Sequence, residues 1–194
     1  IGGIAGGIWN NVLVIGAEDF ASVLDWNDRS TCILFGDGAG ACILTRSAEG
    51  GPRFISGELM ADGDKYDFIT IDKEEGHPSP VLRMKGSEVF RFVNTYLPPF
   101  LKNFCEKSGV TPPEVDFWVL HQANTRIIDS LFKRLGVSTD RTLINLENYG
   151  NTSAASMVVT LDEAMKEGRV KSGEKIMFTA FGAGMTLGAL LYEA

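Results

Sequence analysis

The sequence predicts an α/β protein built around a mixed sheet. Residues 12–16, 118–120 and 175–179 are short apolar runs, which are typical of buried strands. Segments 124–135 and 154–165, which lie between the second and third of these runs, carry apolar residues at helical spacing. Strands that alternate with helices along a chain indicate α/β architecture.

The bulk composition is that of an ordinary soluble globular protein. The chain has 194 residues, of which 44% are hydrophobic, so it is long enough for one large domain or for parts of two. A net charge of −7 argues against a general nucleic-acid binder. Three cysteines without metal-ligand spacing, no basic leader and no long apolar stretch predict a cytoplasmic protein with no metal site and no membrane segment.

A glycine-rich motif occurs twice in the chain. Residues 35–38 (Phe-Gly-Asp-Gly) run into an apolar segment at 40–44, and residues 181–184 (Phe-Gly-Ala-Gly) run into another at 188–191. Both are typical of glycine-rich turns between antiparallel strands. The repeat predicts two similar halves, with residues 1–47 ending the first half and residues 48–194 forming most of the second.

The elements follow in order along the chain. Residues 12–16 read as a strand buried on both faces, and the charged segment 72–80 as a surface loop. Residues 86–105 have a helical pattern, which Pro98 and Pro99 should end, kink or restart because proline lacks the N–H donor. Apolar faces are expected on the next two helices, from Ile127, Ile128, Leu131, Phe132 and Leu135 on the first and from Met157, Val158, Leu161 and Met165 on the second.

Two polar segments stand beside ordered elements. Residues 121–127 follow an apolar strand, and residues 148–153 precede a helix, so His121 and Asn151 each lie at an element's end. Scaffolds place catalytic groups at such ends. A neutral imidazole and a carboxamide together can hold one oxyanion. Taken singly, each residue also has a structural explanation, because a lone histidine can be satisfied by backbone and an asparagine after glycine is a common turn or cap residue.

Several motifs in order resemble one family. They are His-Gln-Ala-Asn-Thr-Arg-Ile-Ile at 121–128, Gly-Asn-Thr-Ser-Ala-Ala-Ser at 150–156 and Phe-Gly-Ala-Gly-Met-Thr-Leu-Gly at 181–188, with further matches at 35–40 and 84–90. Together they resemble β-ketoacyl-acyl-carrier-protein synthase III over the whole chain. The resemblance implies a thiolase-type fold with αβαβα layers and a homodimer. It also implies an acyltransferase of fatty-acid synthesis that condenses acyl-CoA with malonyl-acyl carrier protein, with loss of carbon dioxide and without a cofactor.

The resemblance assigns His121 and Asn151 to the second and third positions of a Cys-His-Asn triad. In the family the nucleophilic cysteine precedes the strand that residues 12–15 resemble, so it would fall before Ile1. None of the three cysteines of the chain has the setting of a nucleophile at a helix N-terminus. The expected partner of the chain is therefore a cysteine-bearing N-terminal portion.

Further site residues also follow from the resemblance. Ala183 stands where the family's second oxyanion hole uses a backbone N–H, and it would be strained if that position required a positive φ. Phe181 matches an aromatic residue beside the catalytic pair. Arg29 resembles a residue that stacks on the adenine of CoA, whereas Gly86 and Asn124 resemble contacts to the pantetheine arm.

A basic helix face is a candidate docking site for the acidic carrier protein. Its candidate residues are Arg91, Arg126, Lys133 and Arg134, of which the last three are spaced on nearly one face of a helix. A solvated helix face explains the same residues equally well.

Three other functions remain open on the sequence. The chain could belong to a related thioester-condensing acyltransferase of the hydroxymethylglutaryl-CoA or polyketide synthase type. It could be a non-catalytic module that binds the carrier protein, or a fragment with no function of its own.

Overall fold

The main sheet has four strands in the order β3-β8-β7-β6. The computed structural model describes residues 1–194, and the strands are β3 (Arg53–Ala61), β6 (Phe117–Leu120), β7 (Lys175–Gly182) and β8 (Thr186–Glu193). β8 pairs antiparallel with both β3 and β7, whereas β6 pairs parallel with β7. The predicted mixed sheet is confirmed.

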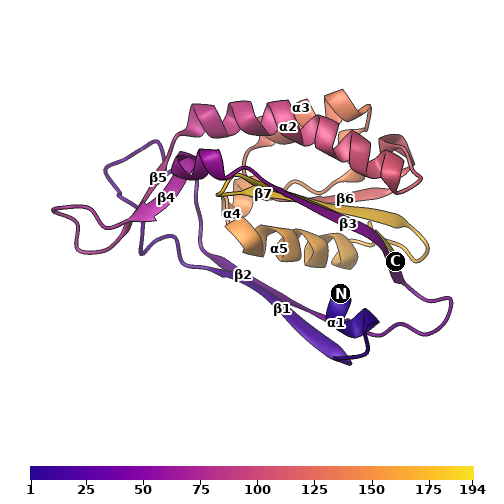
Figure 1. Cartoon of the computed structure of the whole chain (residues 1–194). Helices are drawn as coiled ribbons and strands as arrows, with labels where there is room; N and C mark the ends of the chain where they lie inside the picture. Colours follow the sequence, from indigo (N-terminus) through magenta and orange to yellow (C-terminus); the bar gives the residue numbers. More distant parts are fainter.

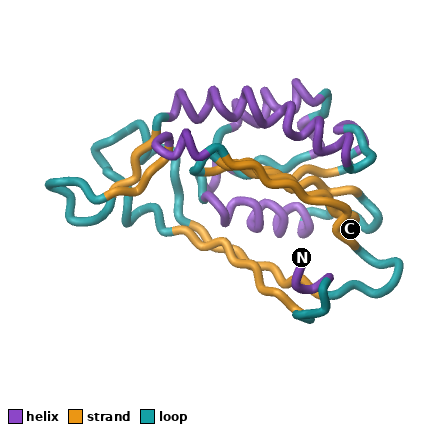
Figure 2. The backbone as a smooth tube through the Cα atoms, in the orientation of Figure 1, coloured by secondary structure: helices purple, strands orange, loops and turns teal.

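The chain is layered as helix, sheet, helix, sheet (Figure 1). Helices α2 (Gly86–Lys107) and α3 (Thr125–Leu135) cover one face of the main sheet, and α5 (Ser153–Lys166) covers the other. Beyond α5 lies an antiparallel pair, β1 (Asn11–Glu18) and β2 (Gly38–Thr45), as Figure 2 also shows. These are four of the five expected layers.

The remaining elements are short. The strands β4 (Ile69–Asp72) and β5 (Val81–Met84) pair antiparallel and form a separate hairpin. The short helices are α1 (Gly2–Ala5), η1 (Gly63–Phe68), η2 (Pro112–Glu114), η3 (Thr139–Arg141) and α4 (Leu146–Tyr149). The loop between β4 and β5 agrees with the surface loop expected at 72–80. None of the helices combines the length and the apolar character needed to cross a bilayer.

The main core lies between the sheet and the helices α2 and α3. Trp118 of β6 is fully buried there and packs edge-on against Phe132 of α3, with ring centroids 5.7 Å apart. All five apolar residues predicted for the α3 face are buried. Burial of such a face stabilises a helix of this length, which would be marginal in isolation.

Helix α2 continues through both prolines, so of the three expected effects an end and a restart of the helix are excluded. Pro98 cannot donate to the carbonyl of Asn94, four residues earlier. Arg134 of α3 supplies the missing donor, because its Nη1 lies 2.6 Å from that carbonyl oxygen. The side chain of Asn94 in turn accepts a hydrogen bond from Ser130 at 2.6 Å. A side chain on the neighbouring helix thus replaces a bond that proline removes.

The strand at 12–16 is not buried on both faces, contrary to expectation. Leu13 and Ile15 of β1 are 58% and 61% exposed, because β1 pairs only with β2 and is covered only by α5. Gly16 permits close packing of β1 against α5, since a Cβ atom at this position would lie 2.7 Å from the carbonyl oxygen of Ala154 on α5.

The most deeply buried residues of α5 are small, while the predicted Met157, Val158 and Leu161 are half-buried, and Met157 and Leu161 pack against a small core on β6 and β7. Ala155, Ser156, Thr160 and Ala164 are buried, whereas Met165 is 60% exposed. The helix is packed between two sheets, so its tightest contacts require small side chains.

The two glycine-rich motifs differ in structure. Residues 183–185 form the expected turn between the antiparallel strands β7 and β8. In the first motif no strand directly precedes the turn; Phe35 forms only an isolated bridge to Asn151 before β2 begins. The division into halves at residue 47 stays a prediction.

Candidate active site

His121 stands one residue beyond the end of β6. Its backbone N–H donates to the carbonyl of Thr179 at 3.0 Å, which continues the pairing of β6 with β7. Its ring nitrogen Nδ1 lies 2.9 Å from the Oγ of Ser156 on α5. The ring of Phe181 contacts the imidazole edge-on, with centroids 5.2 Å apart. Groups from α5 and β7 therefore fix the ring.

The surroundings keep His121 neutral. Burial lowers the pKa of the imidazole from its ordinary value of 6.5 to about 4, and the backbone of Ser153 opposes that shift. The expected neutral histidine therefore agrees with the local environment. A neutral imidazole offers one N–H donor and one acceptor nitrogen.

The backbone of Asn151 is held by the segment that precedes β2. Its N–H donates to the carbonyl of Leu34 at 2.8 Å, and its carbonyl accepts from the N–H of Gly36 at 3.0 Å. The chain enters this position through Gly150, whose φ of +70° favours glycine. A segment more than 110 positions away in sequence thus positions Asn151.

The side-chain amide of Asn151 is oriented by a single contact. Its Oδ1 accepts a hydrogen bond from the N–H of Ser153 at 2.9 Å. Because the oxygen is committed to that contact, the amide NH₂ is the group left to donate, and it has no partner within the chain. The residue is 9% exposed, so a donor to a bound ligand is available in a largely buried setting.

His121 and Asn151 both line one cavity of about 640 Å³. Most of its wall is apolar, with contributions from Phe20, Leu34, Phe35, Ile69, Ile71, Leu82, Met84, Val89, Phe90 and Ile127. An apolar cavity of this size with a few convergent polar groups is typical of a small-molecule site.

Four further predicted residues line the same cavity: Phe181, Ala183, Gly86 and Asn124. Gly86 begins α2, and Asn124 caps α3 by accepting the N–H of Arg126 at 2.9 Å. Ala183 does not have a positive φ, so the strain considered for an alanine at this position is absent. The structure therefore places six of the predicted site residues around one cavity, and their roles stay predictions.

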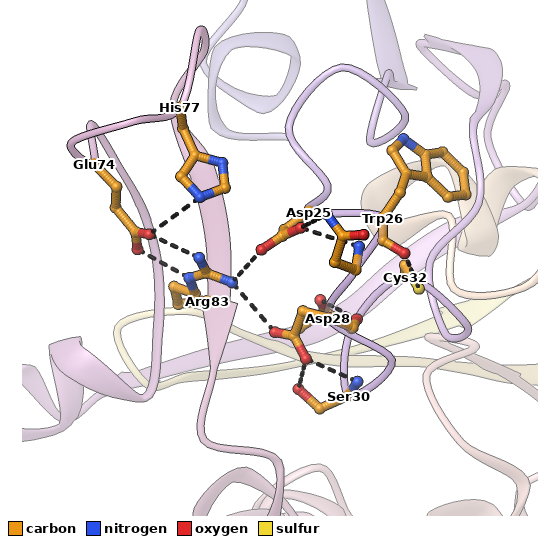
Figure 3. Close-up of polar contacts among 10 residues, drawn as sticks. Asp25, Trp26, Asp28, Ser30, Cys32, Glu74, His77 and Arg83 are labelled. Atoms are coloured by element: carbon orange, nitrogen blue, oxygen red, sulfur yellow. Dashed lines mark hydrogen bonds and ion pairs between the residues drawn. The ribbon is translucent and has the colours of Figure 1, made fainter.

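Arg29 does not line the cavity. Arg29 is exposed. Other residues of its loop, among them Asp25 and Asp28, make the polar contacts that Figure 3 shows. In that loop Asp25 and Asp28 both accept from Arg83 Nη1, at 3.2 and 3.3 Å, and Arg83 also pairs with Glu74 at 2.7 Å. Arg83 lowers the pKa of the Glu74 carboxyl, chiefly through that hydrogen bond. The cluster joins the 19–37 loop to the β4–β5 hairpin, and both contribute to the cavity wall.

The four predicted docking residues lie on α2 and α3, and all are exposed. Arg91 pairs with Glu88 at 3.3 Å, and Arg134 is committed to the carbonyl of Asn94. The side chains of Arg126 and Lys133 form no ion pair within the chain. Arg134 thus has a structural contact as well, but its guanidinium keeps its charge, and the docking role of all four residues stays a prediction.

None of the three cysteines lines the cavity. Cys105 is buried in the core, and burial raises the pKa of its thiol to about 11. Cys32 and Cys42 are partly buried and unpaired. No group of three or more His, Cys, Asp or Glu side chains is arranged to hold a metal ion.

Sequence reasoning missed a polar network that links the two polar segments. The side chain of Gln122 donates to the carbonyls of Leu120 and Leu143, at 3.2 and 3.1 Å, and accepts from the N–H of Asn145 at 3.4 Å. Asn145 donates to Glu163 at 2.8 Å, and Glu163 also accepts from the hydroxyl of Tyr149. Only the polarity of Gln122 beside His121 could have signalled this network.

Two family models match the chain. The model described as "3-Oxoacyl-[acyl-carrier-protein (ACP)] synthase III C terminal" matches residues 105–194, and the model described as "3-Oxoacyl-[acyl-carrier-protein (ACP)] synthase III" matches residues 2–63. The chain belongs to the 3-oxoacyl-[acyl-carrier-protein] synthase III family. The family resemblance predicted from the motifs is confirmed.

Individual synthase III relatives agree with this assignment. The curated "Beta-ketoacyl-[acyl-carrier-protein] synthase III" of Aquifex aeolicus is 43% identical over 188 residues, which cover 97% of this chain and 59% of the relative. The crystal structure of the synthase III from Aquifex aeolicus VF5 matches with a TM-score of 0.92 and 41% identity, over 100% of this chain and 61% of that chain. The thiolase-type fold is thereby confirmed, and the chain spans 59% of the length of this synthase III relative.

A polyketide enzyme is also similar. The priming β-ketosynthase from the R1128 polyketide biosynthetic pathway matches with a TM-score of 0.86 and 34% identity, over 97% of this chain and 59% of that chain. Synthase III-type architecture therefore also occurs in an enzyme of a polyketide biosynthetic pathway.

Proposed function

We propose that this chain supplies His121 and Asn151 to a decarboxylative Claisen condensation of the synthase III type. In this reaction an acyl group from acyl-CoA forms a thioester with an enzyme cysteine and releases free CoA. Malonyl-acyl carrier protein then loses carbon dioxide, and its enolate carbon attacks the acyl thioester. The products are 3-oxoacyl-carrier protein and the enzyme thiolate, which takes up a proton to restore the thiol.

One observation carries this proposal: the unpartnered amide NH₂ of Asn151 and the imidazole of His121 belong to the same cavity. Loss of carbon dioxide builds negative charge on the thioester oxygen. Preorganised donors at that oxygen lower the barrier, and removal of one such donor typically costs about 10²–10³ in rate. The reaction needs no resident cofactor, because the thioester itself stabilises the enolate.

The apolar cavity wall fits the rest of the substrate. A short acyl chain is apolar, and a pantetheine arm has methyl and methylene groups between its two amides, so both would contact the 19–37 loop and the β4–β5 hairpin on one side. Gly86, Asn124 and Ala183 are proposed contacts along this path, with Phe181 beside the catalytic pair. Arg29 lies outside the cavity and remains a proposed contact for the nucleotide end of CoA.

The acidic carrier protein is the proposed macromolecular partner. Arg91, Arg126 and Lys133 are exposed on the α2–α3 layer, which also contributes residues to the cavity. Attraction between opposite charges would direct the carrier protein to this face. A homodimer and a cytoplasmic location belong to the same proposal.

The test joins this chain to the part of the Aquifex aeolicus relative that it does not match. The chimera would be given acetyl-CoA and malonyl-carrier protein, and the carrier protein would be weighed by mass spectrometry. We expect the mass of a 3-oxobutanoyl group on the carrier protein. We expect none of it from a chimera with both His121→Ala and Asn151→Ala. Equal product from both chimeras would exclude this pair from catalysis.

The likeness to the R1128 priming β-ketosynthase favours a second candidate, a condensing enzyme of polyketide synthesis. Both candidates use the same chemistry and differ in the acyl group. Competition between acetyl-CoA and longer acyl-CoAs in the same assay distinguishes them, because preference for the longer acyl group would favour the polyketide role.

A further inference from the structure

Ser156 occupies a junction between the two polar segments of the site. It lies on the first turns of α5 and is only 3% exposed. Its Oγ lies 2.6 Å from the carbonyl oxygen of Ser153, 2.9 Å from Nδ1 of His121 and 3.2 Å from the backbone nitrogen of Gln122. One buried hydroxyl thus contacts three groups.

The chemistry of two of these neighbours decides where the hydroxyl proton points. A hydroxyl has one proton to donate and two lone pairs to accept with. The carbonyl of Ser153 can only accept, so the hydroxyl proton is directed to it across the shortest of the three contacts. The N–H of Gln122 can only donate, so it occupies one lone pair.

The remaining lone pair of Ser156 faces Nδ1 of His121. That contact is attractive only if Nδ1 carries a proton. If the ring proton were on Nε2 instead, the hydroxyl proton would have to rotate to Nδ1. Two oxygen atoms, Oγ of Ser156 and the carbonyl oxygen of Ser153, would then face one another at 2.6 Å with no proton between them.

We infer that Ser156 is a positioning residue that holds neutral His121 in the Nδ1–H tautomer and leaves an unprotonated Nε2. Histidine tautomers are commonly set by the hydrogen bond of the second ring nitrogen. Here the partner is a serine whose own proton is committed to the α5 backbone. The edge-on contact with Phe181 limits rotation of the ring that would replace Nδ1 by a ring carbon beside Ser156.

A catalytic consequence follows, and it rests on the proposed condensation. In the resting site the NH₂ of Asn151 is the committed donor, whereas Nε2 of His121 accepts a proton. A thiol that enters the cavity would donate a hydrogen bond to Nε2, and its proton would pass to Nε2 as its sulfur attacks the thioester carbonyl of acyl-CoA. The imidazolium formed in that step would keep its Nδ1–H bond to Ser156 and return the proton from Nε2 to the sulfur of CoA as CoA leaves. The neutral ring is then restored, so the NH₂ of Asn151 is the donor that faces the enolate oxygen in the condensation step.

The tautomer can be measured directly, because the chain has only two histidines, His77 and His121. The full chain would be labelled with ¹⁵N in the imidazole rings and examined near neutral pH by long-range ¹H–¹⁵N correlation spectra. A His77→Asn variant assigns the two sets of signals. We expect His121 to show a protonated-type Nδ1 shift and an unprotonated-type Nε2 shift. The reverse pattern in the unmodified chain would overturn the inference.

Two variants test whether Ser156 is responsible. Ser156→Ala should reduce the Nδ1–H population of His121, and Ser156→Thr, which keeps the hydroxyl, should retain it. An unchanged spectrum of a folded Ser156→Ala chain would assign the tautomer to another group and overturn the role of Ser156. The spectra need neither thioester nor carrier protein, so their outcome is separate from that of the condensation assay. Should Ser156→Ala not fold, the unmodified chain and Ser156→Thr still decide.

Discussion

Acidification should destabilise the folded chain through His121. The pKa of this imidazole falls from 6.5 to about 4 on burial, so between these values the unfolded chain binds a proton that the folded chain does not. Stability therefore decreases as pH falls through this window and levels off below about pH 4, where both states are protonated. At about 1.4 kcal/mol per pH unit, the effect is at most about 3 kcal/mol, and partial exposure of the residue reduces it.

A double comparison isolates this effect from the carboxylates that titrate nearby. The free energy of unfolding would be measured by urea denaturation at several pH values, for the unmodified chain and for His121→Asn, which cannot titrate. We expect the free energy of unfolding of the unmodified chain to fall, relative to that of His121→Asn, by about 2–3 kcal/mol between pH 7.5 and pH 4. A difference that is constant with pH would refute the conclusion that burial holds His121 neutral.

Three other predictions concern donors and charges. Asn151→Ala should slow release of carbon dioxide from malonyl-carrier protein in the chimera by about 10²–10³, as measured by trapping of labelled carbon dioxide. A release rate within about threefold of that of the parent chimera would contradict the donor role of Asn151. Arg134→Met should lower the free energy of unfolding by about 1–2 kcal/mol, because it leaves the Asn94 carbonyl without a donor. The control variant Lys133→Met should change the free energy of unfolding by less than about 0.5 kcal/mol. Equal effects of the two variants in urea denaturation would argue against a stabilising contact between Arg134 and Asn94. Charge reversal at Arg126 and Lys133 should weaken carrier-protein binding and reduce its salt dependence, whereas reversal at Lys166, on α5, should not, as measured by titration calorimetry at two ionic strengths.

Local sequence patterns correctly predicted the elements that pack against a single core and the residues that belong to a motif. The α3 face was predicted in full because an amphipathic helix against a single core shows its spacing directly. The cavity residues His121, Asn151 and Phe181 were found because each belongs to a recognisable motif.

Predictions failed where a distant contact determined the outcome. The continuation of α2 depends on Arg134, which lies 40 positions from the carbonyl that it satisfies. The small buried face of α5 depends on a second sheet packed behind it, and helical spacing cannot report that. Ser156 carries no motif of its own, so its contact with His121 could be found only from the fold.

A crystal structure of the chimera with a malonyl thioester analogue that cannot lose carbon dioxide would locate the oxygen that Asn151 is proposed to bind. The account predicts that the thioester carbonyl oxygen lies about 2.7–3.1 Å from Nδ2 of Asn151 and beside the imidazole of His121, within the 640 Å³ cavity. An analogue bound with its carbonyl oxygen away from Asn151, or outside this cavity, would contradict the account.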